Sequence, residues 1–397
     1  MRFVAFFEVP EEELDNYIER WKERLPGKND VKIKIPPHTL GESCDGITGF
    51  VVFESESFKQ VKEYLSKFIQ TGAKIKLYLT WEDSELAKEL ILFKKGKQQA
   101  ALEWTESKFQ KLTNVGTTQT LEVLPLIDWY TSRDDLLGEN GVSYLIRTDE
   151  HTILFDLGIN RKQTDPSPLL QNMNKLGISL TDFDTIVISH NHGDHTGGGK
   201  WSKKNTFSLT AKQIDLTGKK VYTPVPMSYP RIKPIHSKNP TIIGKGVTTI
   251  GTISNGMFFL GKKGLEHEQA LAINVEGKGI VLIVGCGHQT LPKILARAEM
   301  LFDEPIYGII GGLHYPVEGG PIVMMGMSPY KHFGTGKVPW RHISREEVKE
   351  NIELLKKKNP KIVAISAHDS CTTSLEMFRS AFSDAYRDIR VGEQIRI

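Results

Sequence analysis

The stretch TIVISHNHGDHTGG, from Thr185 to Gly198, joins a short apolar run to a cluster of three histidines and one aspartate. The apolar part, Thr185 to Ser189, has the β-branched composition of a buried strand in an α/β layer. The glycines that follow give the chain the backbone freedom to turn. A polar surface loop can collect such residues by chance, but four polar side chains at the end of a rigid strand indicate a metal site.

The spacing of these four side chains indicates how they share metal ions. His190 and His192 point to the same side of extended backbone, so both can bind one cation. Asp194 and His195 follow a turn and can reach a second cation nearby. Imidazole with one carboxylate suits Zn²⁺, and Fe or Mn is compatible with it. Two cations roughly 3.5–4 Å apart would hold a bridging water, lower its pKa towards about 7 and make hydroxide available.

Three more apolar runs end in a histidine and supply further candidate ligands. VLIVGCGH ends with Cys286 and His288, YGIIGGLH ends with His314, and VAISAHD contains His368. A lone histidine after a strand is more often a hydrogen-bonded polar residue than a ligand. The recurrence of the pattern beside the histidine cluster favours His288 and His368 as ligands, whereas His314 can equally bind substrate.

These motifs resemble those of the metallo-β-lactamase superfamily. SHNHGDHTGG, preceded by ILFDLG, carries the resemblance over roughly Leu121 to the C-terminus. The GCGH, GGLH and terminal histidine elements further resemble a branch of dihydropterin ribofuranosylaminobenzene-phosphate synthase-like proteins. The resemblance implies an α/β fold, the αββα metallo-β-lactamase sandwich, with a dinuclear metal site at one edge of its two sheets. It also implies one metal on His190 and His192, a second on Asp194 and His195, and a buried Asp156 that orients the ligand loops.

The sequence departs from the superfamily where most members carry a metal-bridging aspartate at the end of a strand. The dipeptide GC stands in that place, and a Cys286 thiolate can ligate zinc. The alternative is a simple buried cysteine, with the second metal weak or absent. The superfamily also places a ligand histidine before that strand, where this chain has His267 and Glu268. The branch pattern favours His288 as the ligand, and His267 is its main rival.

A small unit precedes these motifs. Its alternating and helix-periodic apolar residues follow the order β-α-β-β-α-β, which predicts a ferredoxin-like α+β domain over residues 1–112. We expect a structural or assembly role for it, with a homo-oligomer as the assembly. The polar stretch from Thr113 is the predicted linker, and the second domain spans 121–397. Within the second domain, the Gly-, Pro- and Met-rich segment 315–340 is either a lid over the metals or an ordered surface insertion.

Composition narrows the classes of function. The 397 residues are 39% hydrophobic and 25% charged, which is typical of globular proteins. The net charge of +3 argues against a dedicated nucleic-acid partner, and no apolar run approaches the length of a membrane span. The N-terminus lacks the pattern of a signal peptide. Because Cys44, Cys286 and Cys371 cannot form a disulfide framework, we expect a reducing, cytoplasmic location.

We therefore expect a metal-dependent hydrolase in which a metal-bound hydroxide attacks a small-molecule ester. Asp194 would steer the proton from the water to the leaving group. The branch resemblance favours a phosphoester or a pterin-related phosphorylated compound over a lactone or a thioester. Two alternatives stay open: a nuclease of the same fold, and a metal- or ligand-binding sensor that does not hydrolyse anything.

Overall fold

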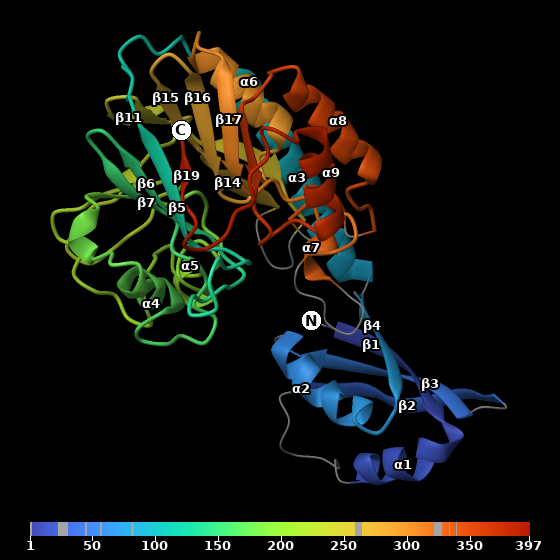
Figure 1. Ribbon diagram of the computed structural model, residues 1–397. Coiled ribbons are helices and arrows are strands. Elements are labelled where there is room, and N and C mark those ends of the chain that lie inside the picture. Colours follow the sequence, from blue (N-terminus) through green and yellow to red (C-terminus); the bar gives the residue numbers. More distant parts are fainter. Residues whose placement is uncertain are drawn as a thin grey trace. The chain divides into compact units, whose positions relative to one another are not determined.

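The computed structural model (Figure 1) describes residues 2–22, 31–43, 46–55, 58–80, 83–258, 264–320, 328–332, 334–338 and 340–397. The chain divides into two compact units, one of residues 1–90 with 322–329 and one of residues 91–321 with 330–397. The division lies inside helix α3 (Asp83–Glu106), upstream of the polar stretch that we predicted as the linker. The limits 1–112 and 121–397 stay a prediction.

The N-terminal unit has the expected ferredoxin-like topology. Its four-stranded sheet has the order β2-β3-β1-β4, and each neighbouring pair is antiparallel. Along β1 the side chains of Phe3, Ala5 and Phe7 are buried while Phe6 is 42% exposed, because successive residues of a strand face opposite sides of a sheet. The elements in chain order are β1 (Arg2–Pro10), η1 (Glu11–Glu13), α1 (Leu14–Lys22), β2 (Val31–Ser43), β3 (Gly46–Ser55), α2 (Phe58–Ile69) and β4 (Lys74–Thr80).

The second unit contains two large sheets. The seven-stranded sheet has the order β10-β9-β8-β7-β6-β5-β19 and the six-stranded sheet the order β11-β12-β15-β16-β17-β18. The strands of the first are β5 (Leu121–Ile127), β6 (Ser143–Thr148), β7 (Thr152–Phe155), β8 (Thr185–Val187), β9 (Lys220–Thr223), β10 (Ile235–His236) and β19 (Ile395–Arg396). Those of the second are β11 (Thr241–Gly244), β12 (Val247–Thr249), β15 (Leu271–Val275), β16 (Gly279–Val284), β17 (Ile306–Gly311) and β18 (Ile362–Ile365). A separate hairpin pairs β13 (Ile253–Gly256) with β14 (Leu265–Glu268).

Helices lie on the outer faces of this pair of sheets, and Figure 1 shows α6, α8 and α9 beside the six-stranded sheet. The described helices of the unit besides α3 are α4 (Pro168–Lys175), η2 (Leu180–Asp182), α5 (Gly199–Ser202), α6 (Leu291–Leu301), α8 (Arg345–Lys356) and α9 (Thr372–Ala381). Helix α7 (Pro329–His332) lies where the two units divide. Among the described residues, no helix has both the length and the apolar character needed to cross a membrane. Cys286 and Cys371 are buried and free, and Cys44 lies outside the described residues.

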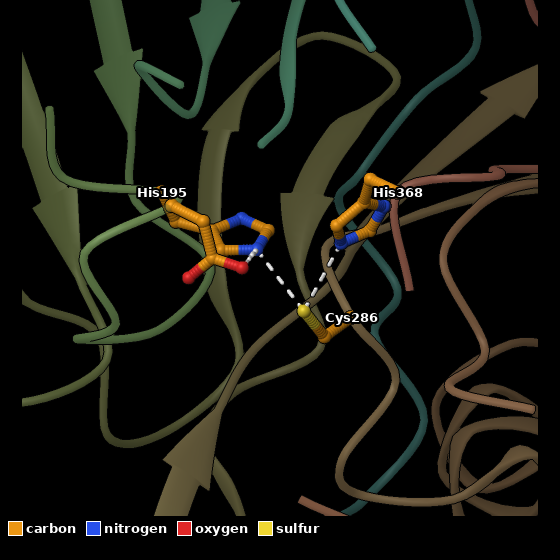
Figure 2. A group of neighbouring side chains, drawn as sticks. His195, Cys286 and His368 are labelled. Atoms are coloured by element: carbon orange, nitrogen blue, oxygen red, sulfur yellow. Dashed lines mark hydrogen bonds and ion pairs between the residues drawn. The ribbon is translucent and has the colours of Figure 1, made fainter. Parts of the chain in front are cut away.

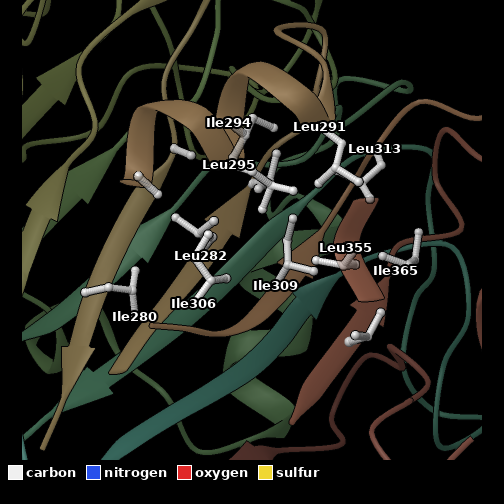
Figure 3. Close-up of a cluster of buried hydrophobic side chains, with 14 of the residues drawn as sticks. Ile280, Leu282, Leu291, Ile294, Leu295, Ile306, Ile309, Leu313, Leu355 and Ile365 are labelled. Atoms are coloured by element: carbon white, nitrogen blue, oxygen red, sulfur yellow. The ribbon is translucent and has the colours of Figure 1, made fainter. Parts of the chain in front are cut away.

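The alternation of side chains along the strands produces three buried layers. Ile283 of β16 belongs to the cluster between the two sheets, together with Phe155 of β7. Its neighbour Leu282 faces the other way and packs with residues of α6 and α8 (Figure 3). Leu154 of β7 packs with α4 on the outer side of the seven-stranded sheet. Strands that are buried on both faces, covered by helices outside, give the αββα sandwich that the sequence predicted.

The buried interface between the sheets predicts a contrast between two isoleucines. Replacing Ile283, which is fully buried, by alanine should lower the free energy of unfolding by about 2–5 kcal/mol because it leaves a cavity. Ile242→Ala on β11, where the side chain is 42% exposed, should change it by no more than about 0.5 kcal/mol. Urea denaturation of the two variants measures both values. Equal losses would contradict the assignment of Ile283 to the layer between the sheets.

Candidate metal centre

The predicted site residues follow the carboxyl ends of neighbouring parallel strands. β7 is parallel to β8, and β16, β17 and β18 are parallel to one another. The carboxyl ends of parallel strands meet at one edge of a sheet, where ligands usually bind. Each of these strands is followed within three residues by a titratable side chain: Asp156 after β7, His190 after β8, Cys286 after β16, His314 after β17 and His368 after β18.

In one group of four, three side chains surround the sulfur of Cys286. His195 Nε2 lies 3.0 Å from Cys286 Sγ, and His368 Nε2 lies 3.1 Å from the same sulfur on its other side (Figure 2). Asp194 Oδ2 is 3.7 Å from His195 Nε2. One nitrogen, oxygen or sulfur atom from each of these four residues lies within 4.8 Å of the others, which is close enough for the four to hold a single cation.

A second set of side chains adjoins the first. His190 Nε2 lies 3.0 Å from His192 Nδ1, and the His288 ring centroid is 4.9 Å from that of His190. Two ligand groups form here: His190 with His192 and Asp194, and His190 with His288 and Cys286. Asp194 and Cys286 thus belong to groups on both sides of the site. All seven residues that the sequence analysis named as ligands therefore lie together in space.

The buried imidazoles are held by their Nδ1 atoms, which leaves Nε2 for a cation. Nδ1 of His195 lies 2.7 Å from Asp156 Oδ2, and Nδ1 of His368 lies 2.7 Å from Ser366 Oγ. Nδ1 of His190 lies 2.9 Å from Ser189 Oγ, and that of His288 lies 2.8 Å from the Gly334 carbonyl oxygen. Fixing one ring nitrogen in this way sets the orientation of a metal-binding histidine.

The donor atoms themselves fit a divalent cation. His288 Nε2 is buried and has no hydrogen-bond partner among the described residues. A buried polar atom without a partner is costly, so such an atom beside other donors indicates a place for a ligand. Imidazole nitrogen, carboxylate oxygen and thiol sulfur together are the donors that Zn²⁺ takes in proteins. The residues present therefore fit the metal that the fold implies.

Burial sets the protonation states of the centre. It lowers the pKa of His190, His288 and His368 well below the ordinary value, and repulsion between the neighbouring imidazoles acts in the same direction. These rings are therefore neutral at pH 7, which is the form that coordinates metals. Burial also lowers the pKa of His195, but the charges of Asp156 and Asp194 outweigh it and raise that pKa to about 9.

The pKa of the Cys286 thiol shifts in the opposite direction to those of His190, His288 and His368. Burial, together with the negative charges of Asp194 and Asp369, raises the pKa of this thiol well above its ordinary value. The protein alone therefore keeps the sulfur protonated. A thiolate at this position needs a cation beside it, so that binding of a metal to Cys286 releases a proton.

Asp156 holds the loop that bears the histidine cluster. It is fully buried and accepts hydrogen bonds from the backbone N–H of Ser189 at 2.7 Å and from the Ser189 hydroxyl at 2.6 Å. The same carboxylate faces His195. Its backbone φ of +60° is unusual for a residue other than glycine, and such strain gathers at functional sites.

Sequence reasoning did not identify Asp128, which supports His368 from behind. Asp128 accepts hydrogen bonds from the hydroxyls of Ser366 at 2.6 Å and Tyr144 at 2.8 Å, and Ser366 in turn contacts His368 Nδ1. Burial raises the pKa of Asp128 to about 6. The stretch LEVLPLID ends in this aspartate just as ILFD ends in Asp156, and that likeness could have indicated it.

Glu268 organises the loop that carries Cys286 and His288. Its Oε1 accepts the backbone N–H groups of Cys286 and Gly287, each at 2.9 Å, and its Oε2 accepts that of His288 at 2.7 Å. Alternation along β14 explains this contact, because Glu266 and Glu268 face the site and the intervening residue faces away. Glu266 Oε2 accordingly lies 3.0 Å from His192 Nε2.

His267, the rival to His288, is the residue that faces away. Its Nδ1 lies 2.8 Å from the Ser254 hydroxyl on the paired strand β13. It belongs to none of the ligand groups among the described residues. Successive side chains of a strand face opposite sides, and His267 stands at a position of β14 that faces away from the centre.

His314 is buried beside His288. Its ring centroid is 4.7 Å from that of His288, and its backbone N–H donates to Asp369 Oδ2 at 3.0 Å. Asp369, which sequence reasoning missed, forms a further group of three with Cys286 and His314. Of the segment 315–340, the structure describes 315–320, 328–332, 334–338 and 340, and Gly334 is the residue that contacts His288. Whether the segment acts as a lid stays a prediction.

Several known proteins are similar to this chain. Residues 136–255 match the family model of the metallo-beta-lactamase superfamily. The protein named 7,8-dihydropterin-6-methyl-4-(beta-D-ribofuranosyl)-aminobenzene-5'-phosphate synthase, from Methanocaldococcus jannaschii, is 25% identical over 293 residues, which are 62% of this chain and 97% of that protein. The transcription termination factor FttA of Cenarchaeum symbiosum is 40% identical over 53 residues, 13% of this chain and 8% of that protein.

Among solved structures, the metallo-beta-lactamase fold protein YhfI from Bacillus subtilis matches 70% of this chain and 100% of its own, with 14% sequence identity and a TM-score of 0.44. The family model covers the loop that bears four of the candidate ligands, and the described fold is the αββα sandwich. The chain is thus similar to the metallo-β-lactamase superfamily over residues 136–255.

Proposed function

We propose that the chain is a metal-dependent hydrolase with two neighbouring metal positions, each of which uses the sulfur of Cys286. The observation that carries the proposal is that Cys286 belongs both to a group with Asp194, His195 and His368 and to a group with His190 and His288. In this assignment Cys286 stands in the place of the bridging aspartate of the wider superfamily. Zinc is the proposed metal because a thiolate and several imidazoles suit it.

The proposed chemistry is the cleavage of an ester by water. Cations in the two positions would lower the pKa of a water molecule towards about 7 and polarise the bond under attack. Asp194 has a side chain that is 18% exposed, so its carboxylate can reach both the buried groups and an entering substrate. We assign Asp194 the transfer of the proton from water to the leaving group. His314, which lies beside His288, would contact the substrate.

The proposed substrate is a small phosphoester, with a pterin-related phosphorylated compound as the first choice. Support comes from the Methanocaldococcus jannaschii relative, whose name is that of a synthase of a phosphorylated dihydropterin compound. The net charge of +3 over 397 residues gives no support to a nucleic-acid substrate. A cytoplasmic location and a homo-oligomer formed through the N-terminal unit are part of the same proposal.

Metal content distinguishes ligands from neighbouring residues. His192→Ala should lose most of the bound metal, and Cys286→Ala should retain at most about one of two equivalents, because the shared sulfur is gone. His267→Ala is the matched control and should keep the wild-type content, since its ring faces Ser254. Elemental analysis of the purified full chains measures all three. Two equivalents retained by Cys286→Ala would show that the sulfur is not a ligand.

Activity tests the role of Asp194. With zinc content measured on the same samples, Asp194→Asn should lower kcat for bis(p-nitrophenyl) phosphate by about 10²–10⁴-fold, because an amide cannot accept the proton. The same measurement on Asp165→Asn serves as the control, because Asp165 is partly exposed and pairs with Lys212. A zinc-loaded wild type that cleaves no phosphoester, lactone or thioester would contradict the hydrolase and favour a metal- or ligand-binding sensor.

A further inference from the structure

A small cavity adjoins the candidate metal centre on the side of His288 and His314. It has a volume of about 110 Å³, and its wall also includes Thr290, Tyr315 and Lys337. Because His288 belongs to a ligand group, any molecule that entered this cavity would lie directly beside the metal positions. The roles proposed for His288 and His314 leave the rest of this wall without a function.

The hydroxyl of Tyr315 is the feature that indicates a ligand. Tyr315 is 4% exposed, and its oxygen is buried with no hydrogen-bond partner among the described residues. The ring itself is well held, stacked on Phe378 at a centroid distance of 5.6 Å. Burial raises the pKa of Tyr315, so the hydroxyl stays protonated and can donate a hydrogen bond. Tyr315 is a packed residue of the cavity wall with an unsatisfied hydroxyl, which indicates that this hydroxyl serves a molecule bound beside it.

The wall also holds the start of a helix, together with side chains that can donate and side chains that can accept hydrogen bonds. Helix α6 begins at Leu291 in the wall, and the start of a helix carries partial positive charge and unpaired N–H groups. Thr290, directly before it, adopts φ +74°, which is strained for a β-branched residue. Lys337 binds Glu347, so this pair brings no net charge to the cavity. The hydroxyl donors and the start of the helix are therefore what favours a hydrogen-bond acceptor in this cavity.

We infer that this cavity binds the phosphoryl group of the substrate, with Tyr315 and the start of α6 as its donors. The inference deepens the proposed function, because it names the part of a phosphorylated substrate that lies beside the metals. A phosphoryl group presents several acceptor oxygens in a compact volume, which suits a small cavity that offers a tyrosine hydroxyl and the start of a helix. In this assignment His314, which shares the wall, contacts the same end of the substrate.

Binding of inorganic phosphate to the zinc-loaded full chain, measured by titration calorimetry, tests the inference. Tyr315→Phe keeps the ring stacked on Phe378 and removes only the donor, so phosphate affinity should fall roughly tenfold. Because the hydroxyl has no partner in the free protein, the melting temperature without phosphate should stay the same or rise. Tyr229→Phe is the matched control: its ring also stacks on a phenylalanine, but its hydroxyl donates to the Ile214 carbonyl at 2.8 Å. That variant should lose stability and bind phosphate as the wild type does.

Two results would overturn the inference. Unchanged phosphate affinity in Tyr315→Phe would place the anion elsewhere, for instance on the metals. Acetate that binds as tightly as phosphate, with the same dependence on Tyr315, would exclude a phosphoryl-selective site. Phosphate binding that depends on Tyr315 in a protein that hydrolyses no ester would support the cavity while refuting the proposed hydrolase, so the two claims fail separately.

Discussion

The candidate metal centre depends on the hydrogen bonds that hold Nδ1 of its buried imidazoles. Without them, the imidazole rings packed around a thiol could rotate, and their Nε2 atoms would have no defined direction. Asp156, Ser366, Ser189 and the Gly334 carbonyl each hold one ring. The remaining donors then point toward one another at about the spacing that a cation requires. The cost of burying these polar groups side by side is what a bound cation would offset.

The two sheets of the sandwich contribute different halves of the centre. The seven-stranded sheet supplies the loops after β7 and β8, with Asp156 and the four residues of the histidine cluster. The six-stranded sheet supplies Cys286, His288 and His368 from the ends of β16 and β18. The distance between the halves is set by the close-packed apolar layer between the sheets, which includes Phe155 and Ile283. The packing of this apolar layer therefore determines how the ligands from the two sheets are placed relative to one another.

Much of this arrangement could be predicted because it is local in sequence. Apolar runs that end in Cys286, His288 and His368 are visible in the chain, and parallel strands bring such ends together. Two of the supporting carboxylates were not visible in the same way. Asp128 and Glu268 act through backbone N–H groups and hydroxyls of distant loops, and a single carboxylate has no motif that indicates such contacts. To predict which way His267 faces, one needs the register of β14 with β13, and only the folded chain supplies that register.

X-ray absorption at the zinc edge of the metal-loaded protein tests the central claim most directly, because it detects sulfur bound to the metal. A Cys286 sulfur shared by both positions predicts one sulfur neighbour per zinc at about 2.3 Å, with nitrogen and oxygen neighbours at roughly 2.0–2.2 Å. It also predicts a second zinc at roughly 3.5–4 Å. A spectrum with nitrogen and oxygen neighbours alone, and no metal at that distance, would contradict the account.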